Sequence, residues 1–271
     1  MANKKRISWF SSSAAIVTYC LLGASTILIG IGILIILKNN CWDIPNYILN
    51  LIIGLSTNLL GIIVTIVFVQ YFLDKQSQKD EKERETAKIK RFDRIMKIML
   101  ERYALFFYCI TTPIIKRENI ETLPLNVNFD IKDMCDMYSS SLCLSENIMG
   151  SAIETFYETE NDLRQYIIKT IENIDFNYHK PLKECLLSFV EISIGNEVKG
   201  AILGNTKIYS GKEKISEIAI RGLKDSPQNW VEKGDNNQLD SNIMFSYYSL
   251  YKTLKKEAEL LNEYNEYISK V

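Results

Sequence analysis

The stretch YILNLIIGLSTNLLGIIVTIVFVQYFL, Tyr47 to Leu73, decides the fold, because it contains no charged side chain. A helix of about 20 apolar residues is long enough to cross the hydrocarbon core of a bilayer. A second uncharged run, Ala14 to Leu37, precedes it, and the segment 38–46 with Pro45 separates the two. The sequence therefore predicts two transmembrane helices, 14–37 and 47–73, joined as an antiparallel hairpin by a short outer loop, 38–46.

The N-terminal segment 1–13 begins with MANKKR, which is also typical of the basic start of a signal peptide. We reject that alternative for two reasons. The apolar run is about twice as long as the usual 7 to 15 residues of a signal peptide, and it lacks a clean cleavage site before Lys38. A second span also follows it directly.

Basic residues predict the orientation of the hairpin. Three of them precede the first span, the outer loop holds only Lys38, and the segment 74–94 holds eight. Lysine and arginine concentrate on the cytoplasmic side of membrane proteins, so both termini are expected in the cytoplasm, which indicates the bacterial inner membrane. The chain after Leu73 holds 28 basic and 32 acidic side chains, a net of −4, which argues against a general nucleic-acid binder.

Small and polar residues share one face of the second span. At about 100° per residue they fall within roughly a third of the helix circumference. A plain anchor needs none of them. These residues are Asn50, Gly54, Thr57, Asn58, Gly61 and Thr65.

Two interpretations of this face remain open. The first span carries Gly23, Thr26 and Gly30, and small residues on both helices would let them pack closely within one hairpin. Alternatively, the amides of Asn50 and Asn58 need hydrogen-bond partners in lipid, and several hairpins could supply them by self-association, or around a wet lumen. The face has no charge, so it does not predict an ion-selective channel.

The rest of the chain is expected to be helical, which makes the protein all-α. The segment 74–94 is densely charged and predicts a stalk helix that continues the second span. The segment 95–271 predicts a cytoplasmic helical bundle: one helix ends near Pro113, another begins at a capping box of Ser151 and Glu154, and a long last helix follows a cap at Asp240 or Ser241. The segment from Gly195 to Gly234 is the least regular.

The sequence contains only weak matches to catalytic or cofactor-binding motifs. We therefore expect neither an enzyme nor a cofactor. The lone histidine, His179, is expected in a loop or at the surface rather than as a catalytic base. Asp130, Asp133 and Asp136 could face a cation, but they better suit an acidic helix start, so no metal is expected. Acid pairs such as Glu158 and Glu160 are interpreted as solvated. The glycines Gly204 and Gly211 do not have Walker A spacing.

The scattered cysteines and the tyrosines of the last helix each allow more than one interpretation. Cys109, Cys135, Cys143 and Cys185 form no C-x-x-C pair and are expected as reduced thiols, while Cys41 in the outer loop could link two copies. The last helix is rich in tyrosines, which favour its burial in the core, with partner binding as the alternative. These tyrosines are Tyr247, Tyr248, Tyr251, Tyr264 and Tyr267.

The stretch Tyr47 to Glu85, with NLLGIIVT at Asn58 to Thr65 and the charged exit helix, resembles small bacterial two-transmembrane proteins of anti-phage operons. These include the two-transmembrane effectors of some retron systems. The resemblance covers 1–94. It implies an abortive-infection effector, or toxin, that contacts membrane lipids and itself as a homo-oligomer. It also implies that a restraining protein or nucleoprotein complex, encoded nearby, holds the effector until infection.

Two other classes of protein fit the sequence. A membrane-anchored sensor or scaffold would use the hairpin only as an anchor. A membrane-tethered enzyme would need a polar pocket that the sequence does not reveal.

Overall fold

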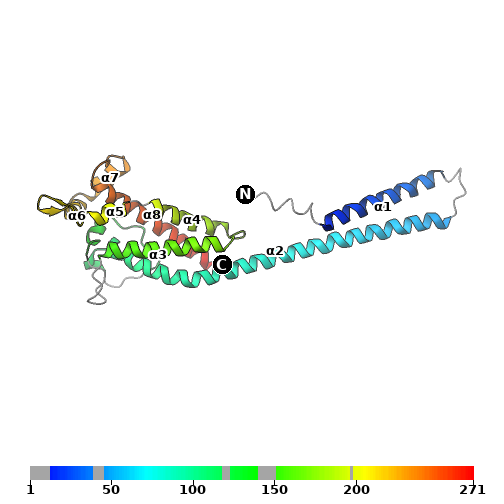
Figure 1. Cartoon of the computed structure of the whole chain (residues 1–271), viewed down its shortest axis with the longest axis horizontal. Helices are drawn as coiled ribbons and strands as arrows, with labels where there is room; N and C mark the ends of the chain where they lie inside the picture. The colour runs from blue at the N-terminus through cyan, green and yellow to red at the C-terminus, as the bar shows by residue number, and fades with distance from the viewer. Residues whose placement is uncertain (1–12, 39–45, 118–122, 140–150, 196–197) are drawn as a thin grey trace. The chain divides into compact units, whose positions relative to one another are not determined.

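The computed structural model describes residues 13–38, 46–117, 123–139, 151–195 and 198–271. It is all-α apart from two strands of two residues each (Figure 1). The all-α prediction is therefore confirmed. Cys41 and most of the expected outer loop, Cys143 and nearly all of the N-terminal segment 1–13 lie outside the described residues.

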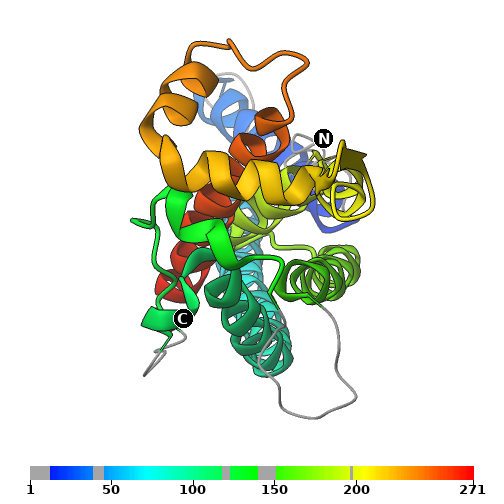
Figure 2. The same cartoon turned by 90° about the vertical axis from the view of Figure 1, so that its left-hand side faces the viewer.

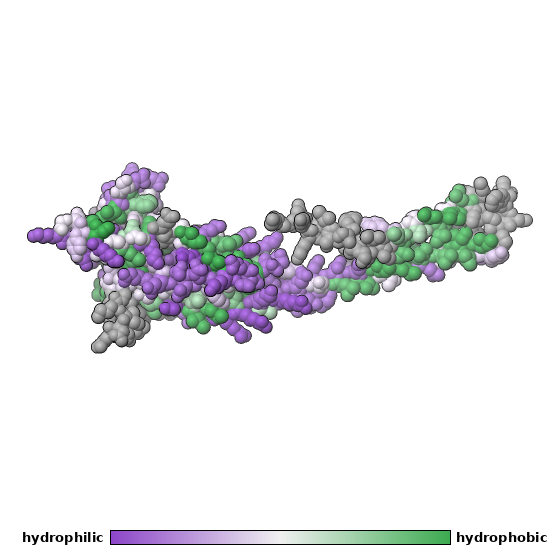
Figure 3. Space-filling model, viewed as in Figure 1, coloured by the Kyte–Doolittle hydropathy of each residue, from purple (hydrophilic) through white to green (hydrophobic). Residues whose placement is uncertain are grey.

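The chain divides into two compact units, Met1–Lys82 and Glu83–Val271. In the first unit, α1 (Ser13–Lys38) lies beside the first part of α2 (Asn46–Thr111), and this surface is mostly apolar (Figure 3). The helix α2 is continuous because no glycine or proline occurs between Gly61 and Thr111, and it ends two residues before Pro113, as the sequence predicts.

Among the described residues, one helix is long and apolar enough to cross a membrane by length and composition. It is the part of α2 from Asn50 to Thr111, with a mean hydropathy of 2.4 in its apolar window. The other apolar segment, Tyr19–Leu34, is shorter.

The second unit is built on the later part of α2 together with α3 (Ala152–Asn173), α4 (Lys180–Gly195) and α8 (Met244–Ser269). Figure 2 looks along these helices, and α8 contacts α4 most extensively. The core centres on Tyr103 of α2, whose ring lies 5.4 Å from that of Phe156 and 6.2 Å from that of Phe189. Each ring is almost fully buried, so α2, α3 and α4 share one apolar core.

The second unit begins at Glu83, inside the segment predicted as a stalk, because Ile89 and Phe92 are already buried in the core. The capping box of Ser151 and Glu154 is confirmed: each side chain accepts a hydrogen bond from the backbone N–H of the other. The predicted cap of the last helix is wrong. Helix α8 begins at Met244, whose N–H donates to the side chain of Asn242 at 2.8 Å.

Short elements cover one end of the second unit. They are η2 (Ile114–Lys116), η3 (Ile131–Asp136), α5 (Lys199–Gly204), α6 (Ile215–Asp225) and α7 (Pro227–Asp235). In Figure 2, α6 and α7 lie in front of the long helices, and both contact η3. Of these elements, α5 and α6 and nearly all of α7 fall in the segment from Gly195 to Gly234, which the sequence indicates as the least regular.

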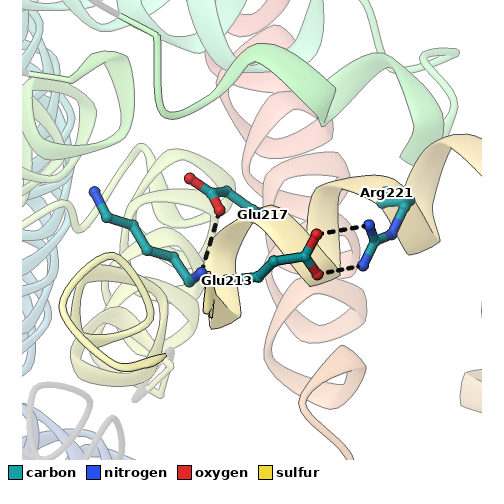
Figure 4. Close-up of polar contacts among 4 residues, drawn as sticks. Glu213, Glu217 and Arg221 are labelled. Carbon is teal, nitrogen blue, oxygen red and sulfur yellow. Dashed lines mark hydrogen bonds and ion pairs between the residues drawn. The ribbon is translucent and has the colours of Figure 1, made fainter. Parts of the chain in front are cut away.

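A β-hairpin in the same region joins β1 (Tyr209–Ser210) to β2 (Glu213–Lys214). Gly211 occupies the turn with φ of 65°, a conformation that costs other residues strain. Arg221 of α6 donates two hydrogen bonds to the carboxylate of Glu213, at 3.0 and 2.7 Å (Figure 4). The hairpin is thereby tied to the helix that follows it.

Candidate functional site

The seam between α1 and α2 is made by residues spaced three and four apart on each helix. Ser25 and Ser56 are buried, at 0% and 5% exposure, and a Cβ placed on Gly32 would lie 3.5 Å from the Cγ2 atom of Ile52. Both serine hydroxyls donate to backbone carbonyls of their own helix. The full seam comprises Leu21, Ser25, Leu28 and Gly32 of α1 with Ile52, Ser56, Leu59 and Ile63 of α2.

The small and polar face predicted from the sequence lies on the other side of both helices. We call it the outer stripe: Gly23, Thr26, Gly30, Asn50, Gly54, Thr57, Asn58, Gly61 and Thr65. At 100° per residue its centre is roughly 180° from the seam on each helix. All of these residues are exposed except Gly30, which is half-buried.

The interpretation that the two polar faces pack against each other within one hairpin is therefore wrong. Added Cβ atoms at Gly23, Gly30, Gly54 and Gly61 would meet no described atom within 4 Å. The smaller residues that do pack the hairpin are those of the seam. The signal that could have found them is the alternation of serine or glycine with large apolar residues at intervals of three and four, a pattern typical of paired helices.

The threonines and the asparagines of the outer stripe differ in their hydrogen bonding. The hydroxyls of Thr26, Thr57 and Thr65 donate to carbonyls one turn earlier, at 2.9, 2.8 and 2.9 Å. By contrast, the side-chain amides of Asn50 and Asn58 are exposed and make no hydrogen bond to a described residue. In lipid these two amides would be the groups that need a partner.

The tyrosines of α8 belong mainly to the core. Tyr247, Tyr251 and Tyr264 are buried, so these three are not a surface for a partner. Tyr264 donates to Asp93 at 3.0 Å. The half-buried Tyr248 and Tyr267 also bond within the unit.

His179 lies in the loop directly before α4, which agrees with the predicted loop position, but it is not at the surface: it is buried, with 5% exposure. Its ring lies between Thr86 and Tyr267, at 3.0 Å from each hydroxyl. Next to it, Glu85 of α2 accepts hydrogen bonds from the backbone N–H groups of Asn177, Tyr178 and His179, at 2.9, 2.9 and 3.1 Å. Glu85 therefore holds the turn that leads into α4 and accepts from the N–H of His179, which directly precedes the first residue of the helix.

The interpretation of Glu160 as a solvated residue is also wrong, because it is 3% exposed. Glu257 of α8, which the sequence did not single out, is 0% exposed. Helix α3 turns Glu160 inward, on the same face as Phe156 and Leu163, while Glu158 stays outside. The spacing of four residues from Phe156 is the signal that could have placed Glu160 in the core.

Asp130 and Asp133 form the start of η3, as expected, whereas Asp136 is its last residue. Asp130 and Asp133 make a capping box, and Asp136 accepts from the N–H of Ile114 at 2.9 Å. Within the described part of the chain, no group of three or more His, Cys, Asp or Glu side chains is arranged to hold a metal ion.

Two surface depressions bear on the enzyme alternative. One, lined by Asp130, Lys132, Glu232 and Tyr251 among others, includes no serine, cysteine or histidine among its described lining residues. The other includes Cys135, and burial raises the pKa of this thiol, which lowers the fraction of reactive thiolate at neutral pH. Neither depression brings a nucleophile against a hydrogen-bonded histidine.

The chain was also compared with protein-family models, with curated proteins and with solved structures, and none of the three comparisons gave a match.

Proposed function

We propose that this protein is a membrane-anchored effector of a bacterial anti-phage system, which self-associates and depolarises the inner membrane when it is triggered. The observation that carries the proposal is the outer stripe, which lies opposite the seam: Cβ atoms added at its glycines would meet no described atom, and its asparagine amides bond to no described residue. The effector role itself comes from the resemblance of residues 1–94 to two-transmembrane effectors.

In this proposal α1 and the first part of α2 cross the membrane as a hairpin held by the seam. The hydrophobic effect does not drive helices together in lipid, so association depends on close packing and on hydrogen bonds between helices. The outer stripe offers both: glycines allow close approach, and the amides of Asn50 and Asn58 would bond between copies.

Self-association would also bring the polar amides around a common axis. A ring of asparagine and threonine side chains in a span is less costly to hydrate than a purely apolar surface, so water could enter between the hairpins. The stripe carries no charge, which supports a nonselective leak over a selective channel. The cytoplasmic unit would receive the trigger or bind the restraining partner and so bias association.

A membrane-anchored sensor or scaffold is the second candidate, and the uncharged stripe favours it over a channel. In that case the stripe would join copies without opening a leak. A leucine in the stripe would then abolish association but would leave growth and membrane potential unchanged.

The experiment measures growth, membrane potential and cross-linked oligomers after controlled expression of the full chain in bacterial cells. Asn58→Leu and Gly61→Leu test the stripe, and Ile62→Leu is the matched control, since Ile62 is an exposed neighbour outside it. Membrane fractionation confirms that each variant is inserted. The proposal predicts depolarisation and oligomers for the wild type and for Ile62→Leu, and neither for the stripe variants.

A wild type that is inserted and oligomeric, yet harmless even when the neighbouring genes and a phage trigger are supplied, would refute the effector role and leave the scaffold. A monomeric wild type under the same conditions would refute self-association through the stripe.

A further inference from the structure

A polar layer crosses the core of the second unit, where α2, α3, α4 and α8 meet. Glu257 of α8 accepts a hydrogen bond from the hydroxyl of Tyr103 of α2 at 2.6 Å, and Glu160 of α3 accepts one from the hydroxyl of Ser193 of α4 at 2.5 Å. The two carboxyl groups lie within hydrogen-bonding reach of each other. Two carboxylates that face each other in a buried site cannot both ionise without a large repulsion.

Two polar atoms in this layer have no hydrogen-bond partner among the described residues. They are the Oε1 atom of Glu257 and the hydroxyl oxygen of Tyr157. An unpaired carboxylate oxygen in a core is strongly unfavourable, because burial removes a charge from water without a compensating hydrogen bond. A proton on this oxygen removes the charge and supplies a donor for Glu160.

We propose that Glu160 and Glu257 share one proton in the folded unit and that its loss loosens the packing of α8 against α3. The inference concerns only the second unit and does not depend on the proposed membrane activity. The proton resides on Glu257, which is fully buried and has Arg164 as its one cationic neighbour among the described residues, whereas Glu160 is influenced by both Arg164 and Lys199.

The charges around the pair support this assignment. Burial raises the pKa of Glu160 as well, but the hydrogen bond from Ser193 and the charges of Arg164 and Lys199 oppose that shift and stabilise its ionised form. Arg164 also donates to the Ser193 hydroxyl oxygen at 2.9 Å, and Lys199 lies over the ring of Tyr157 at 5.3 Å. The titratable or charged groups that face the pair are thus Tyr103 from α2, Tyr157 and Arg164 from α3, and Lys199 from α5; α4 contributes Ser193, which is neutral.

Burial, followed by the negative charge of Glu160, raises the pKa of Glu257 well above its ordinary value. The folded unit therefore holds a proton that the unfolded chain releases near pH 4.3. Stability from this group is fully present below that value and is lost as the pH rises through the raised pKa of the folded state. One released proton lowers the ratio of folded to unfolded molecules about tenfold for each pH unit in this window.

The test compares the wild type with Glu257→Gln, using the full chain in detergent micelles. The amide of glutamine keeps the shape of the protonated acid and can donate to Glu160. Urea midpoints are measured from pH 5 to pH 9 by protease resistance of the second unit. They give the ratio of folded to unfolded molecules at each pH. Glu158→Gln is the matched control, because Glu158 is exposed on the same helix as Glu160.

The proposal predicts that the wild type loses stability relative to Glu257→Gln as the pH rises, by up to tenfold per pH unit, while Glu158→Gln follows the wild type. Parallel curves for the wild type and Glu257→Gln would overturn it. Stabilisation of the wild type, but not of Glu257→Gln, by Mg²⁺ or Ca²⁺ at neutral pH would also overturn it, since a cation would then occupy the site.

Infrared spectroscopy provides a readout that does not require a folded variant. At pH 8 the exposed carboxyl groups of the wild type are ionised, so a remaining C=O stretch of a protonated carboxyl reports a buried proton. The proposal predicts this band in the folded wild type and its loss on unfolding, and its absence from the folded protein would overturn the proposal.

Discussion

Replacing Glu85 with alanine tests whether α2 holds the N-terminus of α4. The carboxylate of Glu85 is 7% exposed and accepts three backbone hydrogen bonds, from Asn177, Tyr178 and His179. Hydrogen bonds to a charged group contribute about 1.5 to 3 kcal/mol each, and loss of a helix cap costs about 0.5 to 2 kcal/mol. Because the three bonds share one carboxylate, their contributions do not add, and we expect a loss of about 3 kcal/mol in the free energy of unfolding.

A loss of this size lowers the Tm of a unit of 150 to 250 residues by about 6 to 12 °C, at roughly 2 to 4 °C per kcal/mol. The measurement is thermal unfolding of the full chain in detergent micelles, followed by protease resistance of the second unit. Glu85→Gln retains one acceptor oxygen and should lose less. Glu101→Ala is the control, since Glu101 is exposed on the same helix. Equal Tm values for Glu85→Ala and Glu101→Ala would show that the cap contributes nothing to stability.

Two further predictions concern packing and surface charge. A Cβ at Gly234 of α7 would lie 2.4 Å from ring carbons of Tyr248, so Gly234→Ala should destabilise the second unit by about 1 to 3 kcal/mol, whereas Gly200→Ala in α5 meets open space and should be neutral or stabilising. Urea midpoints of the two variants check this, and a stable Gly234→Ala would contradict it. The hydrogen bonds from Arg221 lower the pKa of Glu213, so Arg221→Ala should raise that pKa toward its ordinary value. An NMR titration of the Glu213 side chain measures the change, and an unmoved pKa would show that the ion pair is absent in solution.

Local signals allowed the helical class and several helix boundaries to be predicted from the sequence. The capping box at Ser151 and the proline after Thr111 act through neighbouring residues, so both could be recognised without a structure. The cap of α4 could not, because its acceptor, Glu85, is 92 to 94 residues away from the donors. The pairing of Glu160 with Glu257 could not be predicted either, because Glu257 comes nearly 100 residues later in the sequence.

The outer stripe shows a different limit of prediction from the sequence. The sequence placed its residues on one face of each helix, since helical periodicity requires no partner to be known. It could not tell which face meets the other helix, because small residues occur on both. In the structure the seam takes Ser25, Gly32 and Ser56, and the stripe faces away.

The contact between Glu85 and the turn before α4 also determines where a soluble fragment can begin. A fragment starting at residue 95, the boundary suggested by the charge pattern, would lack Glu85 and Thr86 as well as the buried Ile89 and Phe92. The three N–H groups of Asn177, Tyr178 and His179 before α4 would then lose their acceptor, and the His179 ring would lose one of its two partners. A fragment that starts at Glu83 keeps all of these contacts, so twelve additional residues decide whether the domain can be isolated intact.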